Sequence, residues 1–259
     1  MIITDAHTKF VSQNQEFPRF LVAGESALLV ELGNSIDTAT NDQVLQLDSA
    51  LQRIPKMGIL ETIPAYRSLL VIFDPILQTH DSVMELVEEA LARCVSDAAL
   101  PQAAREWTIP VVYGGAHGFD LAHVAGHCGR SEAEIVALHA EATYRVFMIG
   151  FNPGFPYLGG LAPELYIPRR PVPTPHVEPG CVIIGGGQAA ITSVATPTGW
   201  YVLGRTPVRA FDLGRQSAPF LFRAGDVIRF HPVRQADHDR LLAAEHGGAI
   251  CREQQEVAA

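Results

Sequence analysis

The segment Phe147–Leu161, FMIGFNPGFPYLGGL, combines the residue types that build a rigid binding loop. Proline fixes the backbone φ angle, glycine permits positive φ and close approach, and aromatic rings form stiff apolar walls. Phe151 and Tyr157 are therefore candidates for the wall of a substrate-binding pocket. The same composition is typical of a structural corner packed against a sheet, and the residues alone favour neither interpretation.

A glycine triplet directly precedes Gln188. Consecutive backbone N–H groups in such a loop can bind a carboxylate or a phosphate, and a glutamine amide can both donate to and accept from a lactam. Gly185, Gly186 and Gly187 are thus candidate cofactor-binding residues, and Gln188 is a candidate substrate-binding residue. A bulge at the end of a strand is the alternative explanation of the glycines.

Two further side chains have chemistry suited to an anion or a proton. Arg205, in the sequence GRTP, falls where a strand meets a turn, and its guanidinium can bind a carboxylate through two parallel hydrogen bonds. His176, in a proline-rich loop, can serve as an acid or a base. The alternatives are an arginine that bonds a loop carbonyl and a solvated loop histidine.

Metal-binding patterns are weak in this sequence. His123 and His127 are four residues apart on an expected helix, but the only further ligand at a matching spacing is the adjacent Cys128. The four cysteines form no CxxC pair, which predicts reduced thiols rather than a disulfide framework or a zinc site. We predict that this chain alone binds no metal.

Missing motifs exclude several enzyme classes. The chain has only two lysines, Lys9 and Lys56, and neither follows a glycine-rich loop, so a self-contained P-loop ATPase is excluded. The GxSxG, HExxH and dinucleotide-binding patterns are absent as well. The sequence therefore indicates no stand-alone hydrolase or dehydrogenase.

Length and charge narrow the range of partners. The 259 residues are 47% hydrophobic, with 19 Lys and Arg against 28 Asp and Glu and a formal charge of −9. This is enough chain for one large domain or two modest ones, and the negative charge argues against nucleic acid as a partner. No apolar run reaches the ~18 residues of a membrane span, and Met1–Phe10 lacks a signal-peptide pattern, so we expect no membrane association and a cytoplasmic location.

The first part of the chain alternates apolar strand-like runs with segments whose apolar residues repeat at helical spacing. This order predicts a small α+β unit, a sheet covered by two helices, that ends near residues 98–105. The expected strands lie within residues 20–32, 59–63 and 68–73, and the expected helices cover residues 41–53 and 82–95.

The second part begins with an expected strand over Trp107–Tyr113 and continues with two helices. Asp120 is expected to cap the first helix, and Ser131 with Glu134 forms a capping box for the second. The spacing resembles a DNA-binding helix-turn-helix, but the second helix offers acidic side chains where base-reading ones are needed. From residue 150 to 200, nine glycines and nine prolines separate short apolar runs, which predicts a closed or nearly closed β-barrel. Strands are expected at 182–184, 200–203, 207–213, 220–222 and 227–232, and a last helix at 237–245, followed by a polar tail.

Several separated segments together resemble the family of 5-oxoprolinase B subunits, also called allophanate hydrolase subunit 1 or kinase A inhibitor. The resemblance rests on YRVFMIGFNPGFPYLGGL at Tyr144–Leu161, GWYVLGRTPVRAFD at Gly199–Asp212 and AGDVIRFHPV at Ala224–Val233. The N-terminal AGESALLVELG, PAYRSLLVIFDP and IPVVYGG are similar to the family too, so the resemblance extends from residue 21 to residue 233.

The resemblance implies an α+β fold class, with a small ferredoxin-like N-terminal domain followed by a cyclophilin-like β-barrel domain. The implied division is an N-terminal tail over 1–18, the ferredoxin-like domain over 19–100, the barrel over 101–234, and a C-terminal helix and tail over 235–259. It also implies two partners, the A and C subunits of the oxoprolinase complex, of which the C subunit is a homologous barrel. Together with the B subunit they open 5-oxoproline to L-glutamate using ATP. Phosphorylation of the lactam oxygen turns a poor electrophile into one that water can attack.

The sequence departs from the family pattern in one segment. Where relatives read TPRxxVPAGSVGIAGxQTGIYP, this chain keeps Gln188 but has Thr174 and His176 at positions where arginines are common. The other departures are Cys181, Ala189, Thr192, Ser193 and Thr198. The substituted segment is the one that would bind an anion, so the resemblance carries the fold further than it carries the substrate.

We predict one component of an ATP-dependent 5-oxoprolinase-type complex that opens 5-oxoproline or a related cyclic amide. Tyr157 would wall a cleft completed by a partner barrel, Gln188 would bond the amide, and Arg205 would bind the carboxylate. One alternative is a non-catalytic regulator that binds and inhibits a sensor histidine kinase, as one relative of the family does. The other is a divergent relative recruited to another small-molecule pathway.

Overall fold

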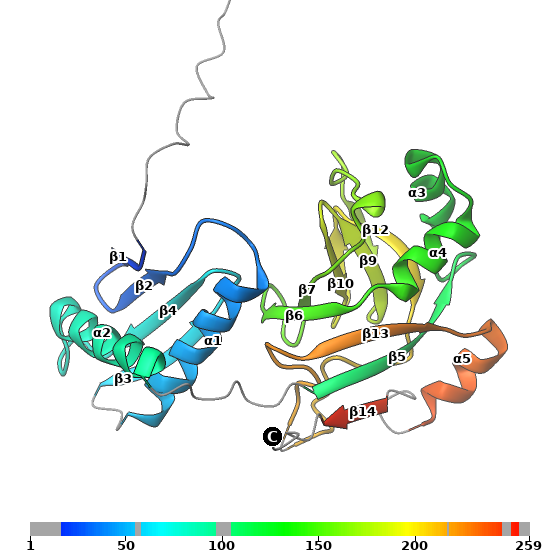
Figure 1. The fold of residues 1–259 in the computed structure, drawn as a ribbon. Coiled ribbons are helices and arrows are strands. Elements are labelled where there is room, and N and C mark those ends of the chain that lie inside the picture. The colour runs from blue at the N-terminus through cyan, green and yellow to red at the C-terminus, as the bar shows by residue number, and fades with distance from the viewer. Residues whose placement is uncertain (1–16, 55–57, 97–104, 217, 245–249, 254–259) are drawn as a thin grey trace, which may run out of the picture. The chain divides into compact units, whose positions relative to one another are not determined.

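A computed structural model describes residues 17–54, 58–96, 105–216, 218–244 and 250–253 (Figure 1). The chain divides into two compact units, one of Met1–Ile63 with Arg67–Val95 and one of Pro64–Tyr66 with Ser96–Ala259. The predicted α+β fold class is confirmed. The predicted boundary near residues 98–105 falls almost wholly outside the described residues.

The first unit is an antiparallel sheet with two helices. Its strand order is β1-β2-β4-β3, in which β1 pairs with β2 and β2 with β4, and the strands expected within residues 20–32, 59–63 and 68–73 are all present. In a ferredoxin-like βαββαβ unit the fourth edge position belongs to a strand after the second helix. Here β1, the first strand of a hairpin, occupies it. The elements are β1 Arg19–Val22, β2 Ala27–Glu31, α1 Thr38–Arg53, β3 Ile59–Pro64, β4 Ser68–Phe73 and α2 His80–Ser96.

The core of this unit follows from the period-2 pattern of the strands and the helical stripe of the helices. Leu69, Val71 and Phe73 point to one face of β4 and are buried, and they share one apolar cluster with Val44 and Leu47 of α1. Burial of such a face is the main favourable term in forming a small α+β unit.

The second unit is a closed barrel of seven strands. The order β12-β9-β10-β7-β6-β13-β5 closes because the end of β5 pairs with β12, and the β5–β13 pair is parallel. A short strand, β14 Ile250–Glu253, lengthens the sheet beside β5 in the segment predicted to be a polar tail. The barrel strands are β5 Arg105–Tyr113, β6 Tyr144–Ile149, β7 Pro156–Gly159, β9 Cys181–Gly185, β10 Gln188–Ile191, β12 Tyr201–Arg205 and β13 Val227–Pro232.

Smaller elements flank the barrel. The helices α3 and α4 pack against β12 and β13 (Figure 1). The strands predicted over 207–213 and 220–222 are wrong, because the described backbone there forms only an isolated bridge between Phe211 and Phe220. The remaining elements are α3 Leu121–Cys128, α4 Glu132–Glu141, a 3-10 turn Pro163–Leu165, β8 Thr174–Val177, β11 Thr196–Thr198 and α5 Gln235–Leu242.

Of the two predicted helix caps, the one at Ser131 is confirmed and the one at Asp120 is wrong. Ser131 and Glu134 form the predicted capping box at the start of α4. The Asp120 side chain makes no capping bond to α3; its carboxylate instead accepts from the backbone N–H of Val202 at 2.8 Å and pairs with Arg170. Tertiary partners therefore replace the local cap: the Val202 amide provides a bond like that of a capping amide, and the charged Arg170 adds a stronger one. No helix in the described residues is long and apolar enough to cross a membrane.

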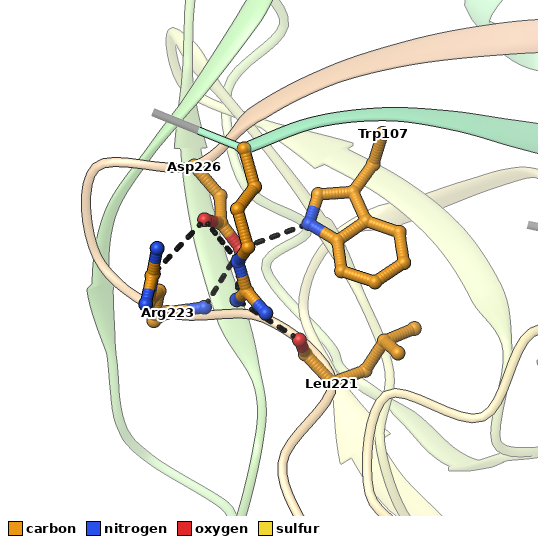
Figure 2. A network of polar contacts seen from close by, with 5 residues as sticks. Trp107, Leu221, Arg223 and Asp226 are labelled. Carbon is orange, nitrogen blue, oxygen red and sulfur yellow. Dashed lines mark hydrogen bonds and ion pairs between the residues drawn. The ribbon is translucent and has the colours of Figure 1, made fainter. Parts of the chain in front are cut away.

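A buried carboxylate joins the beginnings of three barrel strands. Asp226, which directly precedes β13, is 1% exposed and accepts hydrogen bonds from the Arg105 guanidinium at 2.6 and 3.0 Å and from Trp107 Nε1 at 2.9 Å (Figure 2). It also accepts from the backbone N–H of Arg223 at 3.0 Å. The backbone carbonyl of Asp226 accepts from Val146 of β6 at 2.8 Å. The residue thus links β5, β6 and β13.

Replacement of Asp226 with alanine is expected to lower the free energy of unfolding by about 3 to 5 kcal/mol, because it leaves the Arg105 charge and the Trp107 N–H without their partner. Chemical denaturation followed by tryptophan fluorescence measures this. The control is Asp237→Ala, which removes ion pairs only to Arg234 and Arg240, both largely exposed, and should cost less than about 1 kcal/mol. Equal stability of the two variants would contradict the assigned role.

The buried side of α4 carries a neutral histidine. His139 is fully buried, its Nδ1 lies 2.8 Å from the Tyr113 hydroxyl, and its ring stacks on Phe230 with centroids 4.8 Å apart. Its Nε2 has no hydrogen-bond partner among the described residues. Burial lowers the pKa of His139 from its ordinary value of 6.5 to about 3.

Because His139 is buried in its neutral form, we expect the folded protein to lose stability in acid. In the unfolded chain the imidazole binds a proton near pH 6.5, whereas in the folded protein it stays neutral down to about pH 3. The unfolded state therefore holds more protons within this window. The stability is complete above about pH 6.5 and falls by up to ~1.4 kcal/mol per pH unit as the pH drops towards 3. Urea titrations at pH 7, 6 and 5 should show a shallower pH dependence for His139→Phe than for the wild type; equal slopes would refute the assignment.

Candidate functional site

The strand register gives one wall of the barrel two different faces. Tyr157 of β7 pairs with Ala190 of β10, Ala190 pairs with Ile183 of β9, and Ile183 pairs with Val202 of β12. Side chains directly opposite one another share a face. These four therefore line one face, while their chain neighbours, such as Leu158, belong to the barrel core on the other.

Aromatic rings cover the face that is lined by Tyr157, Ala190, Ile183 and Val202. The Tyr157 ring contacts Phe155 edge-on at 4.9 Å between centroids and Trp200 at 6.1 Å. Phe155 and Trp200 are buried, and Tyr157 is half-buried. The predicted wall residue Tyr157 thus lies in a row of rings rather than in an isolated loop.

Gln188 and Tyr66 extend the row. Gln188 Nε2 donates to the hydroxyl of Tyr66, which is in the Pro64–Tyr66 segment of the barrel unit. The Tyr66 ring lies 6.0 Å from Tyr157 and 5.5 Å from Phe147. Burial raises the pKa of Tyr66 and that of Tyr157, so both hydroxyls stay protonated at neutral pH. The amide of Gln188 is consequently oriented by a neutral phenol.

The positively charged side chain of Arg169 lies next to one of these rings. The Arg169 guanidinium carbon lies 5.5 Å from the centroid of the Trp200 ring, a cation–π contact. Its positive charge partly opposes the effect of burial, which raises the pKa of Tyr66 and that of Tyr157. We call Tyr66, Tyr157, Gln188, Trp200 and Arg169 together the aromatic face.

Three of these five residues were missed by the sequence analysis. Tyr66 is far away along the chain, Trp200 was assigned only to a strand, and Arg169 carries no motif of its own. A possible signal was the Arg169–Arg170 pair: in an extended segment, consecutive side chains point to opposite sides. Arg170 indeed pairs with Asp120 and packs on the Tyr201 ring at 4.5 Å, away from Trp200.

The glycine triplet has a packing explanation. Gly185 and Gln188 are paired across a tight turn, and Gly186 has a φ of +63°. A Cβ on Gly185 would lie 2.6 Å from the Trp200 ring, and one on Gly187 would lie 3.0 Å from the Tyr166 ring. The Gly186 N–H donates to the Ile167 carbonyl at 2.7 Å, so this N–H is not available to bind an anion. The triplet lets two rings lie flat on a β-turn, and we leave it out of the proposed ligand site.

Arg205 lies at the other end of these strands from Gln188. It pairs with Cys181, whereas Gln188 pairs with Gly185, so about 13 Å of strand separates the two positions along β9. Arg205 Nε donates to the Pro179 carbonyl at 3.2 Å. This is the structural alternative considered for Arg205, and the two side chains start too far apart to bracket one small lactam.

The other two candidates are exposed. His176 is on β8, and its Nε2 lies 2.9 Å from a carboxylate oxygen of Glu178. Phe151 is 68% exposed and has a φ of +66°, an unfavourable conformation for a residue with a side chain, and its ring contacts Phe155 edge-on. Phe151 therefore continues the row of rings outward, whereas the His176 side chain pairs with Glu178.

No group of three His, Cys, Asp or Glu side chains in the described residues is arranged to hold a metal ion. His123, one of the two histidines considered as ligands, stacks on the Tyr201 ring with centroids 5.1 Å apart. The chemistry available on the aromatic face is therefore hydrogen bonding by an amide, a phenol and a guanidinium beside apolar rings.

Comparison with known proteins agrees with this architecture. The family model described as carboxyltransferase domain, subdomain C and D, matches residues 18–222. The chain is 40% identical over 218 residues to the 5-oxoprolinase B subunit of Escherichia coli O157:H7, covering 84% of this chain and 97% of that protein. It is 35% identical over 225 residues to the 5-oxoprolinase B subunit of Bacillus subtilis (strain 168), covering 83% and 92%. The chain belongs to the family of 5-oxoprolinase B subunits.

Solved structures show the same fold within longer chains. TTHA0988 matches with a TM-score of 0.70 at 34% identity, over 80% of this chain but only 40% of that one. The urea amidolyase of K. lactis matches with a TM-score of 0.74 at 18% identity, over 90% of this chain and 16% of that one, which shows similarity of fold alone.

The departures from the family pattern mostly serve packing. Thr192 Oγ1 accepts from the Cys181 N–H at 2.8 Å and donates to the Glu178 carbonyl at 2.7 Å. Thr198 Oγ1 accepts from the Trp200 N–H at 3.0 Å and so fixes the start of β12. Ala189 points into the barrel core, and burial raises the pKa of the Cys181 thiol, which keeps it unreactive.

The fit of Trp200 on Gly185 is testable. Gly185→Ala should displace the ring, with an overpacking cost of about 1 to 3 kcal/mol, and shift the tryptophan emission. Gly199→Ala is the matched control, because its Cβ would meet nothing closer than 3.8 Å. Urea denaturation and fluorescence spectra of both variants test this prediction. Unchanged emission and stability for Gly185→Ala would show that the ring does not rest on this glycine.

Proposed function

We propose that this protein is one component of a 5-oxoprolinase-type complex and binds 5-oxoproline, or a closely related cyclic amide, on the aromatic face. The membership of the family supports the complex, since the curated relatives are named as B subunits of 5-oxoprolinase. The observation that carries the substrate assignment is the position of Gln188: its amide is bonded to the Tyr66 hydroxyl, and the Tyr66 ring lies 6.0 Å from the Tyr157 ring.

Gln188 is suited to reading a lactam. A primary amide offers a carbonyl that accepts from the lactam N–H and an NH₂ that donates to the lactam oxygen. One of the two Nε2 protons is engaged by Tyr66, which leaves the other for a ligand and stops the amide from rotating. The neighbouring rings of Tyr157 and Trp200 exclude water, and this strengthens each hydrogen bond made there.

The energy source in this proposal is ATP, bound by a partner and not by this chain. A lactam carbonyl is a weak electrophile, and a phosphoryl group on its oxygen makes it susceptible to water. The sequence has no P-loop lysine, so the aromatic face would present the substrate while another protein of the complex supplies the phosphoryl group. We place the complex in the cytoplasm, where ATP is available.

The exposed end of the aromatic row is suited to contact with a partner protein. Phe151 is 68% exposed in a strained conformation at the end of the row of rings, and exposed aromatic residues are frequent at protein interfaces. In TTHA0988 the matching region is 40% of a longer chain, so the fold there is joined to further protein. We propose the A subunit and the homologous barrel-type C subunit of the oxoprolinase complex as the partners that complete the site.

Reconstitution tests the function. A mixture of this chain with both of these partners, ATP and 5-oxoproline should release phosphate and L-glutamate, and omission of this chain should abolish both. Gln188→Ala should lower kcat/KM by about tenfold or more, as expected for the loss of one or two buried hydrogen bonds. His176→Gln is the control and should have little effect, because His176 is exposed and paired with Glu178.

Other outcomes discriminate between the alternatives. Equal rates with and without this chain would refute the proposal. Dose-dependent loss of autophosphorylation of a sensor kinase, without any turnover, would favour the regulator. Turnover of a different cyclic amide alone would favour recruitment to another pathway.

A further inference from the structure

We infer that Arg169, which lies over the Trp200 ring, binds the carboxylate of the substrate and makes the aromatic face selective for cyclic amides that carry an acidic group. The inference rests on the proposed function, because it concerns the same face. It assigns to Arg169 the role that the sequence suggested for Arg205.

Adjacent backbone positions bring the two recognition groups together. Gln188 is the direct cross-strand partner of Gly185, and the Trp200 ring lies on Gly185, where a Cβ would be only 2.6 Å away. Directly opposite residues have side-chain origins about 5 Å apart. Arg169 covers the same Trp200 ring at 5.5 Å. The guanidinium and the amide therefore flank one ring, a spacing suited to a small ligand that carries both a lactam and a carboxylate.

Arg169 is also chemically available for an anion. No ion pair joins it to an acidic side chain in the part of the chain that the structure describes, whereas its neighbour Arg170 is paired with Asp120. A guanidinium carries five N–H donors around the edge of its plane. The cation–π contact holds Arg169 over the Trp200 ring and leaves these donors for bonds to a carboxylate.

The surroundings strengthen such a bond. The rings of Tyr157, Phe155 and Trp200 form a largely apolar floor, and Tyr66 and Tyr157 remain uncharged at neutral pH. A cation beside neutral groups of low polarity is screened less than one in open water. Arg205 lacks this setting, because it is bonded to a loop carbonyl and distant from Gln188 along the strands.

The test compares ligands that differ only in the carboxylate. Calorimetric titration of the full chain, and of the assembled complex, uses 5-oxoproline against 2-pyrrolidinone, and dihydroorotate against dihydrouracil. Arg169→Gln should weaken binding of the carboxylated member by tenfold or more, and leave the uncarboxylated member within twofold. Arg169→Lys should recover only part of the loss, because an ammonium lacks the planar stack and the paired donors.

Controls separate this role from general damage. Arg209→Gln removes an exposed arginine of the same unit that pairs weakly with Asp212, and should bind both ligands as the wild type does. In the complex, Arg169→Gln should raise KM for 5-oxoproline more than it lowers kcat, since the carboxylate does not react. Circular dichroism of each variant verifies the fold.

The outcomes distinguish this inference from the proposed function. Carboxylate-dependent binding through Arg169 without 5-oxoproline turnover would support the inference and remove the proposed function. Turnover that is insensitive to Arg169→Gln, or a loss caused by Arg205→Gln instead, would overturn the inference and keep the function. Equal weakening of the carboxylated and uncarboxylated ligands would also overturn it, because it would mean that Arg169 only supports the ring beneath it.

Discussion

Side-chain alternation along β7, β10, β9 and β12 is the constraint on which the rest of the barrel unit depends. Each strand sends alternate residues into the barrel core and onto the opposite face, and the pairing register brings members of each set together. A slip of one residue in any of these pairs would exchange the two sets. Tyr157 would then point into the core, and Leu158 would point away from it.

That register needs fixed ends, and buried polar bonds supply them. Asp226 holds the beginnings of β5, β6 and β13 together (Figure 2), and Asp120 ties the segment before α3 to β12 through the Val202 amide. The folded protein is destabilised when a buried carboxylate lacks any of its partners. These bonds therefore favour one arrangement of the strands.

The candidate site shows how a binding surface arises from packing. Gly185 is where it is because the Trp200 ring occupies the space of a side chain, and the ring in turn supports Arg169. Gln188 follows the same turn and bonds Tyr66. The elements that stabilise the wall and the groups suited to a ligand are thus the same residues, so a substitution here is expected to affect folding and binding together.

Much of the fold could be read from periodicity and turn residues. Apolar alternation located β4 at Ser68–Phe73, helical spacing located α1, and the capping box at Ser131 marked the start of α4. The errors occurred where a distant partner competes with a local preference. Asp120 has a cap-like position but bonds Arg170 and Val202, and the apolar run at 207–213 forms no strand in the described backbone beyond an isolated bridge at Phe211.

The sequence by itself determined the class of the fold, the family, and two members of the aromatic face, Tyr157 and Gln188, because turn chemistry, periodicity and motif order are local properties of the chain. Only the tertiary structure decided which cation accompanies them. The Arg169 guanidinium covers the Trp200 ring, which lies on the cross-strand partner of Gln188, whereas Arg205 pairs with β9 four positions away from that partner. Such distances are set by pairing between remote segments, which no local pattern specifies.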